Sequence, residues 1–388
     1  MRRCAWILPM SVLVACLACL QKAEAPQKEV IDGVMHVHNP AFPLQGEKTV
    51  TFEEELAIGS ESADGEVLLY EPSLFTVDEQ ENIYISDQAN NVISVFDPEG
   101  RLLRQFGSKG EGPGEFLFIG SMAALTDGKF LVADFQGRRV SVFAGDGVLV
   151  SGHQFLNRPS SILMTSGADY TLLERSFDEE EHIHVKRYDL AGDEILSYGE
   201  FYPHPLSTTP VGGGLYFTPL PFAPESIFAG DPGRQWVYHC YTKEYVIEVY
   251  DTSGSVIRRI DRAYTPVTVS ETDRRDFVSR FENSLPEIAA SVRDIKVPGS
   301  KPVAAGMIGD DKGNLWVRTY ETRTDGGREL TAYDIFDAEG LYQTRAWSER
   351  HPRLFVQGRA YFLDEDDDSG IRTLKKCRVV WGSREDPI

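Results

Sequence analysis

The pattern in this sequence that most resembles a metal site is a pair of histidines preceded by acids. His182 and His184 are one residue apart, so on a β-strand both imidazoles would lie on the same side. Acidic residues just before them could add oxygen ligands: Asp178, Glu179, Glu180 and Glu181. The other interpretation is an exposed acidic hairpin, which we favour because such hairpins are common. We therefore assign no metal ligand and no cofactor.

Two further motifs have the residue types of a binding site but lack its spacing. Asp364, Asp366 and Asp368 alternate as in a calcium loop, but the glycine comes one residue late and no glutamate occupies the twelfth position. We expect a solvated hairpin turn there. The glycine-rich segment 110–114 is followed by neither a helix nor a Lys-Ser/Thr pair, so it lacks the basis of a phosphate site. We expect a connecting turn.

No linear catalytic motif is present, and we assign no catalytic residue. The sequence has neither Gly-x-Ser-x-Gly nor a nucleophile beside a base. Asp87 and Asp134 each end an apolar run, so we expect their carboxylates to hydrogen bond the following turn, or else to face a ligand. Cys240 and Cys377 are the two cysteines outside the leader, and we expect two separate buried thiols.

The first twenty residues form an export leader. Two arginines precede a stretch that is apolar from residue 5 to residue 20 except for one serine, and this stretch is too short to span a membrane comfortably. Within it, Leu13-Val-Ala-Cys16 has the pattern of a bacterial lipobox, in which Cys16 would carry diacylglycerol. Cys19 is the weaker alternative, and simple secretion with cleavage after Ala23 or Ala25 is the other.

The leader implies an order of domains. Residues 1–20 are the signal peptide and anchor region, and residues 21–48 lack periodicity and are predicted to be a flexible tether. Residues 49–382 are predicted to be the folded domain, and residues 383–388 a tail. The formal net charge of -21 would repel phosphate backbones, which argues against nucleic acid as a partner.

The folded domain is built from an all-β repeat. Residues 74–106 contain four short apolar or alternating runs separated by turn residues, which is typical of four antiparallel strands. The turn-and-strand pattern of residues 81–87 occurs six times in the chain. A second marker, an aromatic residue followed by a turn that ends in glycine, ends at residues 100, 147, 192, 254 and 340. The shorter intervals between these glycines are about 45 residues, which is the length of one four-stranded propeller blade.

The repeats predict a six-bladed β-propeller with a specific closure. Little chain follows the sixth repeat, whereas the early alternating run Thr49–Leu56 belongs to no blade. We therefore predict that residues 49–56 form the outer strand of the last blade. Such a strand would join the N-terminal part of the fold to its C-terminal part.

The chain resembles the NHL-related six-bladed β-propeller lipoproteins of bacteria. The resemblance rests on residues 74–106, the loop 107–116 and the run 310–317, and it is strongest over residues 49–147. It implies a propeller in the cell envelope, anchored to a membrane by lipid alone. It also implies a binding module for a protein partner or envelope ligand, since the family has no assigned reaction. The alternative is a metal-dependent, lactonase-like hydrolase or lyase with its site at the central channel.

Two insertions interrupt the repeats. Residues 270–283 predict a helix between blades four and five, capped by Ser270 and Asp273, within a helical insertion over 270–292. Its apolar stripe could pack on the propeller as a local cap, or the helix could be a lid or a docking element. Residues 201–231 are rich in proline and glycine and predict an irregular loop.

Overall fold

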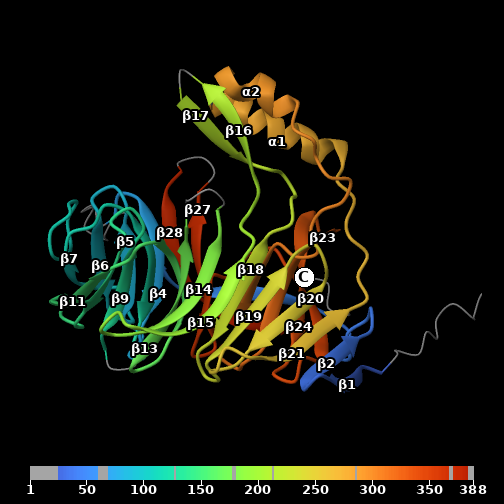
Figure 1. Ribbon diagram of the computed structural model, residues 1–388, viewed down its shortest axis with the longest axis horizontal. Coiled ribbons are helices and arrows are strands. Elements are labelled where there is room, and N and C mark those ends of the chain that lie inside the picture. The colour runs from blue at the N-terminus through green and yellow to red at the C-terminus, as the bar shows by residue number, and fades with distance from the viewer. Residues whose placement is uncertain are drawn as a thin grey trace, which may run out of the picture.

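Six four-stranded antiparallel sheets form the body of the protein (Figure 1). The computed structural model describes residues 25–59, 69–125, 128–176, 181–211, 214–284, 286–366 and 370–382. Blades one to three consist of β4 (Pro72–Val77), β5 (Ile83–Asp87), β6 (Val92–Phe96), β7 (Leu102–Phe106), β8 (Ile119–Ala124), β9 (Phe130–Asp134), β10 (Arg139–Phe143), β11 (Leu149–Gln154), β12 (Arg158–Thr165), β13 (Asp169–Arg175), β14 (Ile183–Asp189) and β15 (Glu194–Phe201).

Blades four to six complete the ring, and the predicted six-bladed propeller is confirmed. Their strands are β18 (Ser226–Asp231), β19 (Trp236–Tyr241), β20 (Val246–Tyr250), β21 (Val256–Arg262), β22 (Gly306–Gly309), β23 (Leu315–Asp325), β24 (Arg328–Phe336), β25 (Tyr342–Ser348), β26 (Leu354–Val356), β27 (Arg359–Glu365), β28 (Arg372–Gly382) and β3 (Glu47–Ile58). The first strand of each blade lines the central channel. We call the face that carries the connections between successive blades the upper face.

The repeated turn has a local cause, which is an aspartate at the end of the inner strand. Asp78 Oδ1 accepts hydrogen bonds from the N–H groups of Gln80 at 2.9 Å and Asn82 at 2.8 Å. Asp310 does the same in blade five, since its Oδ1 lies 2.8 Å from the N–H of Asn314. These bonds satisfy the backbone donors of the turn, so the marker folds in the same way in blades one and five.

The N-terminal strand closes the ring as predicted. Residues 49–58 of β3 pair antiparallel with residues 374–382 of β28, which makes β3 the outer strand of blade six. Residues 47–49 also pair parallel with residues 345–347 of β25, the outer strand of blade five. Val50 of β3 is 2% exposed and belongs to the hydrophobic core between these two blades.

The predicted flexible tether over residues 21–48 is wrong for much of its length. Residues 27–31 form β1 (Gln27–Ile31) and residues 34–39 form β2 (Val34–Asn39), joined by a two-residue turn at Asp32 and Gly33. Both turn residues have positive φ, as a type I′ hairpin requires. β2 pairs parallel with β21, so the hairpin extends blade four to six strands.

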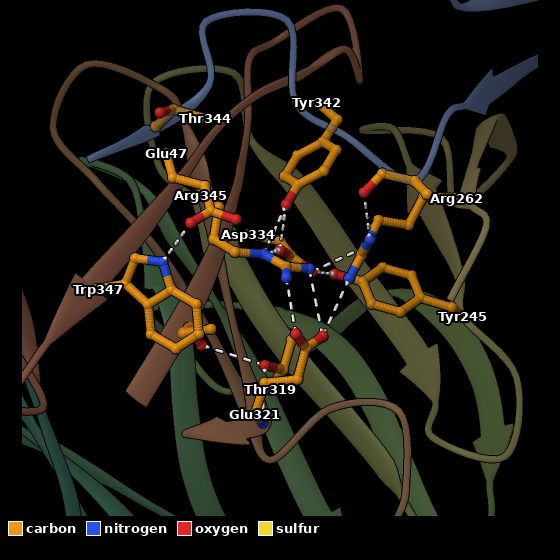
Figure 2. A network of polar contacts seen from close by, with 12 residues as sticks. Glu47, Tyr245, Arg262, Thr319, Glu321, Asp334, Tyr342, Thr344, Arg345 and Trp347 are labelled. Atoms are coloured by element: carbon orange, nitrogen blue, oxygen red, sulfur yellow. Dashed lines mark hydrogen bonds and ion pairs between the residues drawn. The ribbon is translucent and has the colours of Figure 1, made fainter. Parts of the chain in front are cut away.

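A buried ionic network joins blades four and five (Figure 2). Arg262 of β21 is 2% exposed, and its Nε lies 2.9 Å from Oδ2 of Asp334, which is fully buried in β24. Tyr245 donates its hydroxyl to the same carboxylate at 2.8 Å, and Arg345 Nε approaches it to 3.1 Å. Arg262 also donates to the carbonyl of Ala41 at 3.1 Å. The network therefore ties the N-terminal segment to the seam.

The two insertions form one unit above the ring (Figure 1). Two helices are present instead of the single predicted one: α1 (Glu271–Ser284) and α2 (Pro286–Arg293). The predicted capping is confirmed, because the side chains of Ser270 and Asp273 bond each other's backbone N–H groups. The irregular loop predicted over residues 201–231 is wrong in its central part, which forms the hairpin of β16 (Leu206–Val211) and β17 (Gly214–Pro219). It is also wrong at its end, since residues 226–231 form β18, the inner strand of blade four.

The two helices pack on each other, and α2 also packs on β16. Phe277 and Phe281 meet edge to face at 5.4 Å within α1. The helices thus share a small structural unit with the other insertion, an arrangement that neither predicted role described. Of the helices in the described parts of the chain, neither is long and apolar enough to cross a membrane.

Closure by β3 predicts that Val50→Asp destabilises the protein by at least about 3 kcal/mol, because it places a carboxylate in the core between blades five and six. The matched control is Val30→Asp in β1, since Val30 is 63% exposed; we expect a change within about 0.5 kcal/mol. The measurement is the urea unfolding midpoint followed by tryptophan fluorescence. Equal midpoints for the two variants would contradict closure by this strand.

Candidate functional site

A cleft of about 1020 Å³ lies between blades five and six and opens on the upper face. Its walls come from β22, β23 and β24 of blade five and from β27 and β28 of blade six. The connection between the two blades, residues 349–353, supplies the remaining wall. The volume is at the upper end of the range for small-molecule sites, which runs from about 300 to about 1,000 Å³.

Every carboxylate that lines this cleft already has a basic partner. The pairs are Glu349 with Arg328 at 3.4 Å, Asp364 with Arg350 at 2.7 Å, and Glu365 with Arg372 at 2.8 Å. Asp364 also lies 4.0 Å from Lys375. The acids are therefore neutralised by their neighbours and do not give the cleft a net negative charge.

Two guanidinium groups of the cleft remain without a carboxylate partner among the described residues. Arg318 of β23 donates Nη2 to the backbone carbonyl of Ala305 at 3.2 Å, which fixes its position without neutralising its charge. Arg353 is exposed just before β26. In a chain of net charge -21, this local excess of positive charge sets the cleft apart.

A tyrosine and a histidine stand beside these arginines. The hydroxyl of Tyr333 lies 2.9 Å from Nδ1 of His351. Partial desolvation and the neighbouring charge of Arg318 lower the pKa of His351, so the imidazole is neutral at neutral pH and can accept this hydrogen bond. Burial raises the pKa of Tyr333 to about 12, which keeps the phenol protonated.

Arg350 is held in the wall by packing as well as by charge. Its guanidinium lies 3.8 Å from the centroid of the Phe362 ring, and Nη1 lies 3.2 Å from Sγ of Cys377. Together with the bond to Asp364, these contacts fix the side chain. Arg350 therefore shapes the cleft and leaves Arg318 and Arg353 to meet a ligand.

The central channel has a volume of about 640 Å³ and is lined by the inner strands of all six blades. The charged residues among its lining are Arg353 near the upper face and Asp310 and Asp311 at the lower end. The channel and the cleft share three lining residues: Met307, Ile308 and Arg353. The two hollows therefore meet beside β22.

The predicted histidine pair is not part of this site. His184 lies in β14, the third strand of blade three, with Nδ1 3.6 Å from Oε1 of Glu200. Glu181 pairs with Arg175 at 2.9 Å, and Asp178, Glu179 and Glu180 lie outside the described residues. Within the described ranges, no group of three or more His, Cys, Asp or Glu side chains could hold a metal.

The acidic run at 364–370 is only partly described. Asp364 is the last residue but one of β27 and lines the cleft, whereas Asp368 lies outside the described residues. The segment 110–114 lies in the connection from blade one to blade two, as predicted.

Cys240 and Cys377 are separate buried free thiols, which is also confirmed. Cys16 lies outside the described residues.

The predicted structural role of Asp87 and Asp134 is confirmed. Asp87 accepts a hydrogen bond from Ala89 N–H in the following turn at 3.1 Å and another from Tyr70 N–H at 2.9 Å. Asp134 accepts from the N–H of Gly137 at 2.9 Å in the same way. Each aspartate ties the turn after the second strand to its own blade.

The residues of the cleft were missed by reasoning from linear motifs. One signal was available, since Arg318 occupies the position that Ser86 has in blade one and Ala133 in blade two. Both of those residues are fully buried small side chains. The equivalent residue of blade three is Leu173, so a long cation where other blades carry a small or apolar residue indicates a local opening between blades.

Comparisons with known proteins agree with this architecture. A family model described as a 6-bladed beta-propeller matches residues 64–201. A Bacteroides fragilis protein described as exported has a similar structure, with TM-score 0.50 and 12% identity over 90% of this chain and 100% of its own. A member of the DUF4221 family from Bacteroides vulgatus gives TM-score 0.51 and 9% identity over 86% and 99% of the two chains. At these identities the likeness shows the fold alone. No curated protein matches the sequence.

The resemblance to bacterial six-bladed propellers is thereby confirmed. The family model covers the first three blades, and the repeat marker is clearest in the first two of them. The cleft between blades five and six lies beyond the matched segment.

The geometry predicts that His351 titrates below the ordinary histidine value of 6.5 and that Arg318→Gln raises its pKa. Because the folded-state pKa is lowered, the unfolded chain binds more protons in the window just below pH 6.5, so this group stabilises the fold less as pH falls through that window. The measurement is an NMR titration of the histidine ring signals. An unchanged His351 pKa in Arg318→Gln would contradict the electrostatic contact.

Proposed function

We propose that this protein is an extracytoplasmic binding module, anchored to a membrane by lipid on Cys16, whose ligand site is the cleft between blades five and six. The observation that supports it is the pair of guanidinium groups, on Arg318 and Arg353, in a cleft whose acids are all ion-paired. A ligand that matches this cleft is an anion with an apolar body.

The two guanidinium groups suit an anionic ligand because of the chemistry of arginine. A guanidinium keeps its charge at all physiological pH values and donates in a planar fork that suits carboxylate, sulfonate and phosphate groups. Half-buried Met307 and Ile308 supply the apolar part of the wall. A ligand anion would replace the missing carboxylate partners, so its charge contributes to affinity without displacing an existing ion pair.

The proposed location at a membrane surface is inferred from residues 1–20, the predicted export leader. The lipobox at Leu13–Cys16 follows a short basic region and an apolar stretch, which together direct export and lipidation. Cys16 lies eleven residues before the start of β1 at Gln27, so an anchored chain would hold blade four within roughly 40 Å of the bilayer. The anchor would thus keep the propeller at the membrane surface without a spanning segment.

The alternative, a metal-dependent lactonase-like hydrolase or lyase, would need several ligands converging in the channel. Among the described residues that line the channel, the charged ones are an arginine and two aspartates, and the carboxylate of Asp310 is already bonded to its own turn. No observation in the described residues favours this alternative. The described residues therefore support a binding function better than a metal-dependent reaction.

The anchor predicts a simple fractionation result. In cells that process bacterial lipoproteins, the wild-type chain should sediment with membranes, and Cys16→Ala should lose most of its membrane association because it has no thiol for diacylglycerol. Cys19→Ala is the matched control and should fractionate like the wild type. Release of Cys19→Ala instead of Cys16→Ala would move the anchor to residue 19, and membrane association of both would contradict lipidation.

The cleft predicts selective binding of an aromatic anion over its neutral counterpart. We expect 8-anilinonaphthalene-1-sulfonate to bind residues 25–388, a segment that contains the whole closed ring. Arg318→Gln with Arg353→Gln should weaken this dye by about tenfold for each arginine, because each removes a charge-assisted hydrogen bond. Binding of the neutral N-phenyl-1-naphthylamine should change less than about twofold, since it makes no such bond. Fluorescence titration measures both.

The matched control is Arg378→Gln, an exposed arginine of β28 that pairs with Glu53 away from the cleft. It should leave the affinity for both dyes unchanged. An unchanged affinity for the sulfonate in the double variant would refute the cleft as an anion site. A similar loss of affinity for both dyes would indicate damage to the fold, and it would also count against the cleft as an anion site.

A further inference from the structure

We propose that the ligand of this cleft is an amphiphilic anion: its carboxylate or phosphate head lies at Arg318 and Arg353, and its aliphatic chain enters the central channel. The inference rests on the proposed function and deepens it by naming the class of ligand. It follows from three features of the described residues, which are the lining of the channel, the state of its polar groups and its junction with the cleft.

Most of the residues that line the channel are apolar. Each inner strand contributes aliphatic, methionine or phenylalanine side chains, among them Leu163, Phe228 and Leu354. These side chains are half-buried: one side packs into the cores between blades, and the exposed remainder faces the channel. An aliphatic chain would remove this surface from water, and each buried methylene is worth about fourfold in affinity.

The polar groups of the lower end are already satisfied. Asp310 accepts hydrogen bonds from the N–H of Lys312 at 3.0 Å and the indole N–H of Trp316 at 3.0 Å, besides those of Asn314. Asp311 accepts from the N–H of Gly358. These two acids are therefore committed to the turns of blades five and six, and neither is free to bind the head group of a ligand.

Charge without a partner is found only at the opposite end of the channel, among its described lining residues. Arg353 lies immediately before β26, at the upper end, where the channel meets the cleft. Arg318, on β23 of blade five, lines the cleft itself. A ligand that satisfies both surfaces must be charged at one end and aliphatic at the other.

The junction makes a single continuous path. Met307 and Ile308 of β22 line both hollows, as Arg353 does, so a ligand passing from cleft to channel stays in contact with apolar side chains. A neutral ligand would leave the arginines unpaired, and a cationic one would be repelled. A small anion without a chain would leave the channel unused. The amphiphilic anion is the class that uses the whole lining.

The test is displacement of 8-anilinonaphthalene-1-sulfonate from residues 25–388 by soluble amphiphiles below their micelle concentrations. Dodecanoate should compete at least about 50-fold more tightly than hexanoate, because six further methylenes enter the channel. Dodecyltrimethylammonium has the same chain with a cationic head and should not compete. Equal affinities for dodecanoate and hexanoate, or equal competition by the ammonium, would overturn the inference.

A variant tests where the chain lies. Ala123 of β8 lines the channel, and Ala123→Phe should weaken dodecanoate by at least about tenfold while leaving hexanoate within about twofold, since only the chain reaches this point. Ala191→Phe, at an exposed turn of blade three, is the matched control and should change neither. If Ala123→Phe fails to unfold cooperatively, the comparison of chain lengths and head groups on the unmodified chain decides alone.

Two further comparisons distinguish a membrane lipid from a free fatty acid, and a failure of this inference from a failure of the proposed function. 1-Dodecanoyl lysophosphatidate binding more tightly than dodecanoate would indicate a membrane lipid, and the reverse order a free fatty acid; either result supports the inference. If the sulfonate and hexanoate bind through the two arginines but dodecanoate binds no better than hexanoate, the inference fails and the proposed function stands. If the arginines do not affect any anion, both fail.

Discussion

The pairing of β3 with β28 is the constraint on which this structure depends. A propeller is a ring, and without this strand blade six would expose the edge of β28 and lose Val50 from its core. Because β3 also pairs with β25, it holds blades five and six at the seam where the cleft lies. The closure of the fold and the shape of the candidate site therefore share one cause.

The seams on the two sides of blade five differ in how their arginines are paired. In the network of Figure 2, Arg262 and Arg345 are buried with Asp334 and Glu321, so each cation is neutralised and the group joins blades four and five. In the cleft, Arg318 and Arg353 face an open hollow without acids of their own. The contrast separates arginines that hold the ring together from arginines that can meet a ligand.

Much of the fold could be predicted from the sequence, because the turn-and-strand marker recurs in all six blades and local rules suffice to recognise it. The hairpin of β1 and β2 was missed although Asp32-Gly33 is a strong turn signal, since parallel pairing with β21 depends on contacts more than two hundred residues away. The cleft was missed for the same physical reason. Arg318 and Arg353 line the same cleft only when blades five and six pack side by side, and no linear spacing encodes that packing.

The central claim is that an anion's head group lies at the cleft and its chain in the channel. A crystal structure of residues 25–388 with bound dodecanoate tests it most directly. The account predicts the carboxylate within hydrogen-bond distance of the guanidinium groups of Arg318 and Arg353, with the chain running past Met307 toward Ala123. Dodecanoate bound elsewhere, for instance in the groove between β16 and α2, with the cleft and channel filled by solvent, would contradict the account.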